Sequence, residues 1–417
     1  MSQTADRPRV VIIGAGFGGL KAARTLASAP VDVLLVDRHN YHLFQPLLYQ
    51  VASAGLEPEE TAYPIRGILR RQRNARFLLA EVERVDLAAR QVVTNEGVVT
   101  YDYLVLAAGS VTQFFGMESV AQRAFGLKDL MDAIRLRNHV LTMFEQAARS
   151  AELEKCVRLL TFVIVGGGPT GVELAGAFRE LYNHVLARDY PALDFRQVRV
   201  VLVEATDRLL TALAPELGEE AVRTLKSMGV EVRLGAALAG ADDDGIIFKD
   251  GSRLDCATLV WAAGVRGSPL GDTLGLAACR GSRVCVEPSL QVTGHPEVYA
   301  IGDLAYLEAP GGQAYPMVAP VAIQQGEAAA RNIVRQIQAE PPQPFRYQDR
   351  GTMATIGRRA AVAQVGGLKL TGGLAWLAWL FVHLMSLVGF RNRVLVFLNW
   401  AYGYLSYDRG ARIITET

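Results

Sequence analysis

The chain has 417 residues, half of which are hydrophobic, and its Lys and Arg residues exceed its Asp and Glu residues by one. This length favours two or three domains with sizeable buried cores. A net charge near zero provides no strong field toward nucleic acids or other polyanions, so we expect no nucleic-acid partner.

The cysteines also limit the classes of protein to consider. Cys156, Cys256, Cys279 and Cys285 show neither Cys-x-x-Cys nor Cys-x4-Cys spacing. This argues against a dithiol redox centre, a zinc site and a secreted disulfide framework. We therefore expect buried, reduced thiols in a cytosolic protein and no metal site.

Residues 9–26, RVVIIGAGFGGLKAARTL, predict a strand, a glycine turn and a helix. Gly14 would permit the turn, Gly16 would let the backbone approach a pyrophosphate, and Gly19 would let the helix pack close to the sheet. Asp37 ends the next apolar run, where its carboxylate can accept hydrogen bonds from ribose hydroxyls. The alternative is an ordinary glycine turn followed by a solvated aspartate.

Residues 161–178, TFVIVGGGPTGVELAGAF, repeat this design. Gly166, Gly168 and Gly171 have the same spacing, and the helix that follows is again rich in alanine. Glu204, at the end of VRVVLVE, is the candidate ribose ligand, although it comes later than the fingerprint expects. A carboxylate there would repel a 2′-phosphate, so we expect NADH rather than NADPH.

A second recurrence supports the duplication. YDYLVLAAGS (101–110) and LDCATLVWAAGV (254–265) both place an aspartate before an apolar strand that ends in Ala-Ala-Gly. Two dinucleotide sites in one chain indicate hydride transfer, with a nicotinamide docked against a bound flavin. Farther along, residues 290–305 predict a strand followed by an exposed Gly-Asp pair, and a strand pair is expected around Gly357 and Gly366.

The C-terminal stretch differs in character. The apolar run 374–388 would form a helix of only about 23 Å, shorter than a hydrocarbon core of about 30 Å. We expect it to lie on a membrane surface, with a dimer interface and a true span as alternatives. Aromatic and basic side chains would meet lipid headgroups, namely Trp400, Tyr402, Tyr404, Tyr407, Arg391, Arg393, Arg409 and Arg412.

The chain resembles the type II NADH:quinone oxidoreductases, a group of the flavoprotein reductases that have two dinucleotide domains. The resemblance is carried, in order, by VIIGAGFGGLKAA, NYHLFQPLLYQVASAG, VIVGGGPTGVELAGA, VWAAGV, YAIGDLA and PVAIQQGEAAARNI. The glycine motifs occur in many flavoproteins, whereas HLFQPLLYQ and AIQQG are specific. HLFQPLLYQ occupies the position where related reductases carry a redox cysteine, which implies that the flavin reduces an apolar acceptor directly.

The resemblance implies FAD at the first site, NADH at the second and a membrane quinone as electron acceptor. The implied fold class is α/β, with two Rossmann-like domains and a C-terminal amphipathic, membrane-associating helical region. Expected domain bounds are 1–155 and 284–370 for FAD, 156–283 for NADH and 371–417 for the C-terminal region. Expected FAD contacts are Gly14, Gly16, Gly18, Gly19, Asp37, Gln45, Ala108, Gly109 and Asp303; expected NADH contacts are Gly166, Gly168, Gly171, Glu204, Ala263 and Gly264.

Three residues are expected to be catalytic. Glu173 should lie in the first turn of its helix, where the dipole favours a carboxylate, and the resemblance places it near the nicotinamide to position the hydride donor. Gln324 and Gln325 should meet the quinone, because a neutral amide can bond a carbonyl without burying a charge. The family pattern has an earlier glutamine where this chain has Pro320, so Gln324 becomes the stronger candidate for the contact with the quinone. The alternative is that the two glutamines only begin an exposed helix.

The expected enzyme is a peripheral homodimer on the cytoplasmic face of the cell membrane. No run of intramembrane carboxylates or histidines is present, so we expect no proton pumping. Rival functions are a sulfide:quinone oxidoreductase, which would need cysteines beside the flavin, and a soluble NADH-dependent reductase, which would have no use for the C-terminal region. A flavoprotein that binds partners and uses NADH as a signal is a third.

Overall fold

The computed structural model describes residues 7–406 and 409–415. It divides into two compact units: unit 1 comprises Met1–His42, Tyr63–Val111 and Val265–Asp349, and unit 2 comprises Leu43–Ala62, Thr112–Gly264 and Arg350–Thr417. These units differ from the expected domain bounds. Residues 112–155 and 350–370, expected with the FAD-binding domain, pack within unit 2.

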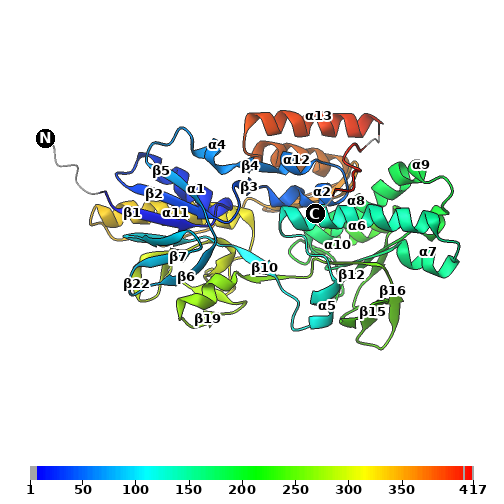
Figure 1. Cartoon of the computed structure of the whole chain (residues 1–417), viewed down its shortest axis with the longest axis horizontal. Helices are drawn as coiled ribbons and strands as arrows, with labels where there is room; N and C mark the ends of the chain where they lie inside the picture. The colour runs from blue at the N-terminus through cyan, green and yellow to red at the C-terminus, as the bar shows by residue number, and fades with distance from the viewer. Residues whose placement is uncertain (1–6, 407–408, 416–417) are drawn as a thin grey trace. The chain divides into compact units, whose positions relative to one another are not determined.

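Unit 1 is built on a six-stranded sheet in which β1 lies between two parallel neighbours (Figure 1). The spatial order is β21 (Gln291–Val292), β22 (His295–Ala300), β9 (Tyr103–Leu106), β1 (Arg9–Ile13), β2 (Asp32–Asp37), β5 (Ala75–Leu79). Ile13 is level with Val36 on one side and Leu106 on the other. The carboxyl ends of these strands therefore meet at one edge, where α/β proteins bind ligands.

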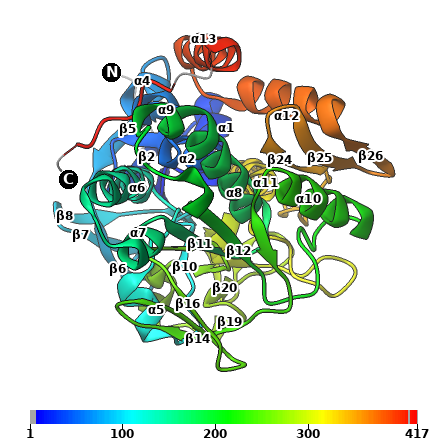
Figure 2. The same ribbon diagram turned by 90° about the vertical axis from the view of Figure 1, so that its right-hand side faces the viewer.

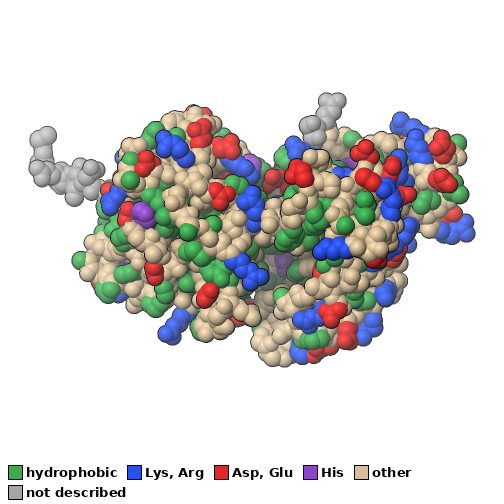
Figure 3. Space-filling model, turned by 90° about the horizontal axis from the view of Figure 1, so that it is seen from below, with side chains coloured by type: hydrophobic (Ala, Val, Ile, Leu, Met, Phe, Trp, Pro, Cys, Tyr) green, Lys and Arg blue, Asp and Glu red, His purple; other side chains and the backbone are tan. Residues whose placement is uncertain are grey.

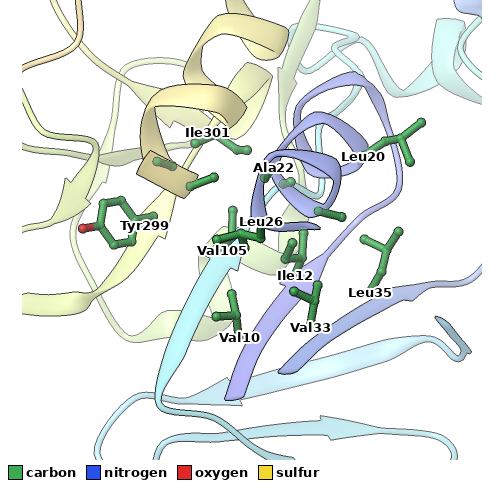
Figure 4. Packing of buried hydrophobic residues seen from close by; sticks show 14 of the residues in the cluster. Val10, Ile12, Leu20, Ala22, Leu26, Val33, Leu35, Val105, Tyr299 and Ile301 are labelled. Atoms are coloured by element: carbon green, nitrogen blue, oxygen red, sulfur yellow. The ribbon is translucent and has the colours of Figure 1, made fainter. Parts of the chain in front are cut away.

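Both faces of this sheet are buried, as the unbroken apolar strands predict. Helices α1 (Phe17–Thr25) and α11 (Ala319–Ile337) pack together over one face. Figure 4 shows this packing, in which Val10 and Ile12 of β1 meet side chains of α1 and the strand neighbours. Val11 and Ile13 point into a second cluster on the opposite face.

The remaining elements of unit 1 are short. They are η1 (Leu26–Ser28), α4 (Ile65–Leu69), β6 (Val82–Asp86), β7 (Gln91–Thr94), β8 (Gly97–Thr100), η5 (Pro269–Leu274), β19 (Ala278–Cys279), β20 (Arg283–Cys285), η6 (Gly302–Leu304) and β23 (Ala305–Tyr306). Strands at the unit boundaries are β3 (Tyr41–Leu43), β4 (Ala62–Pro64), β10 (Ser110–Thr112) and β18 (Val265–Gly267). One expectation is wrong here: Cys279 and Cys285 form a disulfide, and only Cys156 and Cys256 are free.

Unit 2 repeats the parallel arrangement. Its central sheet has the order β13 (Glu231–Arg233), β12 (Arg199–Val203), β11 (Thr161–Val165), β17 (Thr258–Trp261). The hairpin strands β14 (Leu238–Ala241), β15 (Gly245–Phe248) and β16 (Arg253–Asp255) form a separate antiparallel sheet. The helices before the C-terminal region are η2 (Gln45–Leu47), α2 (Leu48–Ala52), α3 (Pro58–Thr61), α5 (Glu118–Arg123), α6 (Leu130–Arg149), α7 (Leu153–Leu159), α8 (Pro169–Leu181), η3 (Tyr182–Leu186), α9 (Ala187–Asp189), η4 (Phe195–Gln197) and α10 (Pro215–Ser227).

The C-terminal part of unit 2 is a small sheet with two helices, as Figure 2 shows. Strands β24 (Thr352–Gly357), β25 (Ala360–Val365) and β26 (Leu368–Thr371) confirm the expected strand pair and add a third strand. Helix α8 lies against β24 so closely that a Cβ on Gly176 would be 1.6 Å from the carbonyl oxygen of Ile356. Helix α12 (Gly372–Ser386) packs on β25, and α13 (Phe390–Ser406) follows.

Polar contacts hold α13 to the short helix α3. The Asn392 side chain is buried and donates to the carbonyl oxygens of Glu60 and Ala62, at 3.3 and 3.2 Å. Asn399 donates to the carboxylate of Glu60. Within residues 7–406 and 409–415, no helix combines the length and the apolar content needed to cross a membrane.

Candidate active site

The first glycine turn, in unit 1, has the geometry of a dinucleotide cradle. Gly14 has φ 102°, and a Cβ there would lie 2.3 Å from the carbonyl oxygen of Ala107. A Cβ on Gly19 would lie 1.9 Å from the carbonyl oxygen of Gly14, so both positions require glycine. A Cβ on Gly16 would meet nothing within 4 Å, which leaves open space at the amino terminus of α1 for a pyrophosphate.

Two side chains fix the shape of this turn. Asp37 Oδ2 accepts a hydrogen bond from the backbone N–H of Ala15 at 2.6 Å. The two oxygens of a carboxylate offer further lone pairs, so Asp37 can still accept ribose hydroxyls. His42, which the sequence analysis did not single out, is buried with Nδ1 2.9 Å from the carbonyl oxygen of Ala15. Burial lowers the pKa of His42, which favours a neutral ring.

The structure places other expected FAD contacts beside this turn. Ala108 follows β9, and its Cα is 3.2 Å from the position of a Cβ on Gly14. Asp303, in η6, accepts a hydrogen bond from Ser110 Oγ, a residue that the sequence analysis missed although it directly follows Gly109. Gly18 has another role: a Cβ there would be 3.0 Å from the carbonyl oxygen of Ala322, so this glycine serves the packing of α1 on α11.

The second glycine turn, in unit 2, repeats the first. Gly166 has φ 118°, and a Cβ there would lie 2.7 Å from the backbone nitrogen of Ala263. A Cβ on Gly171 would be 1.9 Å from the carbonyl oxygen of Gly166, whereas a Cβ on Gly168 would meet nothing within 4 Å. The open position therefore again lies at the amino terminus of a helix, here α8.

Glu204 serves the second turn as Asp37 serves the first. Its Oε2 accepts a hydrogen bond from the backbone N–H of Gly167 at 2.6 Å, and Oε1 accepts one from the N–H of Thr206 at 2.8 Å. Gly264 directly precedes β18, and a Cβ there would lie 3.0 Å from the ring of Phe115. The late position of Glu204 in the sequence thus does not prevent it from reaching the glycine turn.

Glu173 lies in the second turn of α8, not in the first turn as expected, and its side chain is only 8% exposed. The backbone N–H of Thr355 donates to its Oε1 at 3.4 Å. Burial outweighs this bond and raises the pKa of Glu173 to about 8. The carboxyl group is therefore largely protonated at neutral pH, contrary to the expectation that the helix dipole keeps it ionised.

A cavity of about 200 Å³ in unit 2 reaches Glu173. Its wall includes Tyr49 and Gln50 of α2 and Trp400 of α13, none of which was predicted to be catalytic. Gln50 Nε2 donates to the Tyr49 hydroxyl and Trp400 Nε1 donates to Gln50 Oε1, each at 2.8 Å. Gln45, expected to contact FAD, is exposed in unit 2 and donates to the carbonyl oxygen of Lys128 at 3.0 Å.

The two expected quinone ligands lie in the first turns of α11 and make protein contacts. Gln324 exchanges two hydrogen bonds of 2.9 Å with the backbone N–H and carbonyl of Gln348. Gln325 is buried, and its Oε1 accepts a hydrogen bond from the N–H of Gly302 at 2.7 Å. Pro320 occupies an early position of α11, where the missing N–H has no helical partner to lose.

The C-terminal helices carry exposed apolar side chains, but not those that the sequence analysis named. Trp400 is buried, and the ring of Tyr404 meets that of Trp376 edge-on, in a T-shaped contact. Tyr402 is exposed, and Tyr407 lies outside the described residues. The large exposed apolar side chains of α12 and α13 are Leu374, Leu377, Phe381, Val382, Met385, Phe390, Val394, Phe397, Leu398 and Tyr402. We call this set the apolar face.

Most of the arginines expected to meet lipid instead contact protein. Arg409 pairs with Glu180 at 3.2 Å, and Arg412 pairs with Asp189 at 3.0 Å. Arg393 donates to the carbonyl oxygen of Leu387 at 2.9 Å, which leaves Arg391 as the exposed member of the set. Elsewhere, on the face that Figure 3 shows, charges of both signs are interspersed, consistent with the net charge of +1.

No metal site is evident in the described part of the chain, which contains no cluster of three or more His, Cys, Asp or Glu side chains able to hold an ion.

Comparisons with known proteins show which family the chain resembles. Residues 8–326 match the family model described as pyridine nucleotide-disulphide oxidoreductase, and residues 350–406 match the NDH2 C-terminal domain. The Mycobacterium tuberculosis proteins called type II NADH:quinone oxidoreductase Ndh and NdhA are 41% and 44% identical, over all of this chain and 92% and 91% of theirs. A Staphylococcus aureus type II NADH:quinone oxidoreductase is 31% identical over 88% of this chain and 92% of its own length.

Solved structures show the same fold. NDH2 from Plasmodium falciparum, solved in complex with NADH, superposes with a TM-score of 0.90 at 20% identity and covers 98% of this chain and 100% of its own. A sulfide:quinone oxidoreductase from Aquifex aeolicus has a TM-score of 0.72 at 18% identity, over 90% of each chain. The chain belongs to the pyridine nucleotide-disulphide oxidoreductase family and, within it, to the type II NADH:quinone oxidoreductases.

Proposed function

We propose that this protein oxidises NADH at unit 2, holds FAD at unit 1, and passes two electrons to a membrane quinone without pumping protons. The observation that carries the proposal is the pair of matching glycine turns, each with an open helix amino terminus and its own carboxylate, Asp37 or Glu204. The full-length similarity to the M. tuberculosis proteins supports quinone as the acceptor.

The residues of unit 1 fit FAD. The open space at Gly16 suits a pyrophosphate, Asp37 suits a ribose, and Asp303 suits the hydroxyls of the ribityl chain. When bound, FAD supplies the acceptor for a hydride and the donor of two electrons. The chain's own part is to bind and orient the two nucleotides, so catalysis rests mainly on positioning.

The residues of unit 2 fit NADH. Gly168 leaves room for the pyrophosphate and Glu204 accepts hydrogen bonds in the ribose position, where a carboxylate repels a 2′-phosphate. Glu173, neutral at pH 7, can donate a hydrogen bond as well as accept one. We propose that it positions the nicotinamide through such hydrogen bonds, so that no charged group has to be buried in the site.

We propose that the quinone carbonyl contacts Gln324, and that Gln325 instead supports the flavin site. After its bonds to Gln348, the Gln324 amide retains one N–H and one lone pair.

Gln324→Ala should raise KM for a short-chain quinone about 10-fold, the value of a lost hydrogen bond, and leave FAD content unchanged. Gln325→Ala should lower FAD content, because the N–H of Gly302 loses its acceptor. Steady-state kinetics and flavin absorbance measure both, and an unchanged KM in Gln324→Ala would remove that residue from the quinone site.

We propose that the apolar face attaches the protein to the cytoplasmic face of the cell membrane, where a hydrophobic quinone can be reached without crossing water. Large exposed apolar side chains gathered on two neighbouring helices mark an interaction site. Phe381, Phe390 and Phe397 are 67%, 82% and 56% exposed. A homodimer, also expected, would compete for the same surface if it used these helices.

Phe381→Asp combined with Phe397→Asp should lower affinity for vesicles containing anionic lipid by about 100-fold or more, because each buried Phe contributes about 1.5–3 kcal/mol. Vesicle co-sedimentation measures this effect, and reduction of a water-soluble quinone should not change. Leu153→Asp is the matched control, since Leu153 is 64% exposed on α7. Equal sedimentation of the double variant and the control would show that the apolar face does not bind membrane.

Anaerobic stopped-flow spectroscopy tests the proposed function as a whole. NADH should bleach the flavin rapidly, and a short-chain quinone should then restore its absorbance. Rapid bleaching by sulfide with slow bleaching by NADH would favour the sulfide:quinone oxidoreductase function instead. Restoration by oxygen but not by quinone would favour a soluble NADH oxidase.

A further inference from the structure

The disulfide between Cys279 and Cys285 lies in a short hairpin of unit 1. Strands β19 and β20 pair antiparallel, and the turn between them consists of residues 280–282. Both cysteines are partly exposed, and the neighbouring Arg280 is exposed.

The hairpin is connected directly to the loop that carries Asp303. Strand β20 pairs in parallel with β23, with Val284 level with Ala305 and Cys285 level with Tyr306. Strand β23 begins directly after η6, which contains Asp303. A change in the position of β20 therefore reaches the proposed ribityl ligand through two residues of chain.

Arg283, between the two cysteines, reinforces this connection. Its side chain is buried, and Nη1 donates to the carbonyl oxygens of Ala305 and Tyr315 at 3.4 and 3.3 Å. The guanidinium also lies over the ring of Tyr306, 4.7 Å from its centre. At the hairpin turn, the carbonyl oxygen of Gly281 accepts a hydrogen bond from the N–H of Gly267 at 2.8 Å.

We propose that Cys279 and Cys285 form a reversible thiol–disulfide site that controls how firmly unit 1 retains its flavin. The inference rests on the proposed binding of FAD at Asp303. In the oxidised state the disulfide holds β19 and β20 together and keeps the Arg283 side chain hydrogen-bonded to Ala305 of β23. In the reduced state the hairpin opens more often, by as much as about 50-fold for a loop of this length, and the Asp303 loop loses support.

The reductant is a dithiol protein of the thioredoxin class. One of its thiolates attacks a sulfur of the disulfide and displaces the other cysteine as a thiolate, giving a mixed disulfide. The second thiol of the reductant then resolves this intermediate. In total, two electrons and two protons pass to Cys279 and Cys285, and the dithiol becomes a disulfide. The reverse exchange, with the oxidised form of the same dithiol protein as the two-electron acceptor, restores the Cys279–Cys285 bond.

Thiol counting on the full-length holoprotein tests whether the bond forms. After purification without reductant, alkylation in denaturant followed by mass spectrometry should modify two cysteines, and prior treatment with dithiothreitol should raise this number to four. Modification of all four cysteines without reductant would overturn the proposal.

The rate of FAD release, followed by the rise of flavin fluorescence, tests the control. Dithiothreitol should increase this rate about 5- to 50-fold, and Cys279→Ser with Cys285→Ser should release FAD fast in either condition. Cys156→Ser is the matched control and should respond like the parent. Equal release rates, within twofold, in the oxidised and reduced protein would overturn the inference. Slow flavin reduction by NADH would count against the proposed function alone, because neither readout here depends on it.

Discussion

Gly168→Ala is expected to raise KM for NADH by about 10- to 150-fold while the protein keeps its fold and its FAD. The new Cβ meets no protein atom within 4 Å, and the backbone φ of −73° suits alanine. It occupies the space through which a pyrophosphate must approach the amino terminus of α8. A lost charged hydrogen bond costs about 1.5–3 kcal/mol, which corresponds to this range.

The measurement combines NADH-dependent flavin reduction with thermal unfolding. Gly168 is the residue before the helix, where alanine is slightly worse than glycine, so Tm should fall by no more than about 3 °C. Gly373→Ala is the matched control, since a Cβ there also meets nothing within 4 Å. Gly373 belongs to neither glycine turn. If Gly168→Ala kept the parental KM, the second glycine turn would not be the NADH site.

Glu173→Gln is expected to stabilise the protein, and to do so more strongly as pH rises. The carboxyl group titrates near pH 4.5 in the unfolded chain and near pH 8 in the folded protein. Between these values the folded state holds a proton that the unfolded state has lost, so the free energy of unfolding decreases as pH increases. The total loss is on the order of 4–5 kcal/mol by pH 8, and glutamine removes it.

Thermal unfolding of the holoprotein between pH 5 and pH 9 measures this effect. The Tm of Glu173→Gln should exceed that of the parent by an amount that is small near pH 5, grows to several degrees by pH 8, and is constant above it. Glu219→Gln, a change at an exposed glutamate of α10, should show no such trend. A constant difference in Tm at every pH would mean that Glu173 is ionised in the folded protein.

The glycine turns are the part of the site that the sequence predicted best. Gly14 and Gly19 of unit 1, and Gly166 and Gly171 of unit 2, lie where a Cβ would collide with the backbone. Gly19 and Gly171 would collide with their own turns, and Gly14 and Gly166 have a positive φ, so a short stretch of sequence encodes these requirements. Asp37 was predicted for the same reason, since it follows an apolar strand at a fixed spacing. The collisions of Gly14 and Gly166 with Ala107 and Ala262 arise only in the folded sheets.

Burial was predicted less well. The position of Glu173 in α8 was off by one turn, and its raised pKa comes from burial among residues far away in sequence, which outweighs the hydrogen bond from Thr355. The same limit applies to Gln325, whose amide is used by Gly302. A sequence shows that a side chain is polar, but not which distant backbone group will reach it.

The C-terminal helices show the limit of composition as a guide. Their helical, apolar nature was predicted correctly, yet Trp400 points inward to Gln50 and Arg409 pairs with Glu180. The cysteines are a second case, because Cys279 and Cys285 meet only where β19 and β20 pair. Aromatic and basic residues beside an apolar run do not indicate by themselves which of them face solvent.

The sequence by itself determined the two dinucleotide turns, their strands and helices, and the apolar C-terminal region. These features follow from local spacing, since a strand, a glycine turn and a helix are specified within about 20 residues. The tertiary structure decided which C-terminal side chains form the apolar face, why Glu173 is neutral, and which two cysteines are joined. Those properties depend on burial and on contacts between residues that are distant in sequence, and both exist only once the chain has folded.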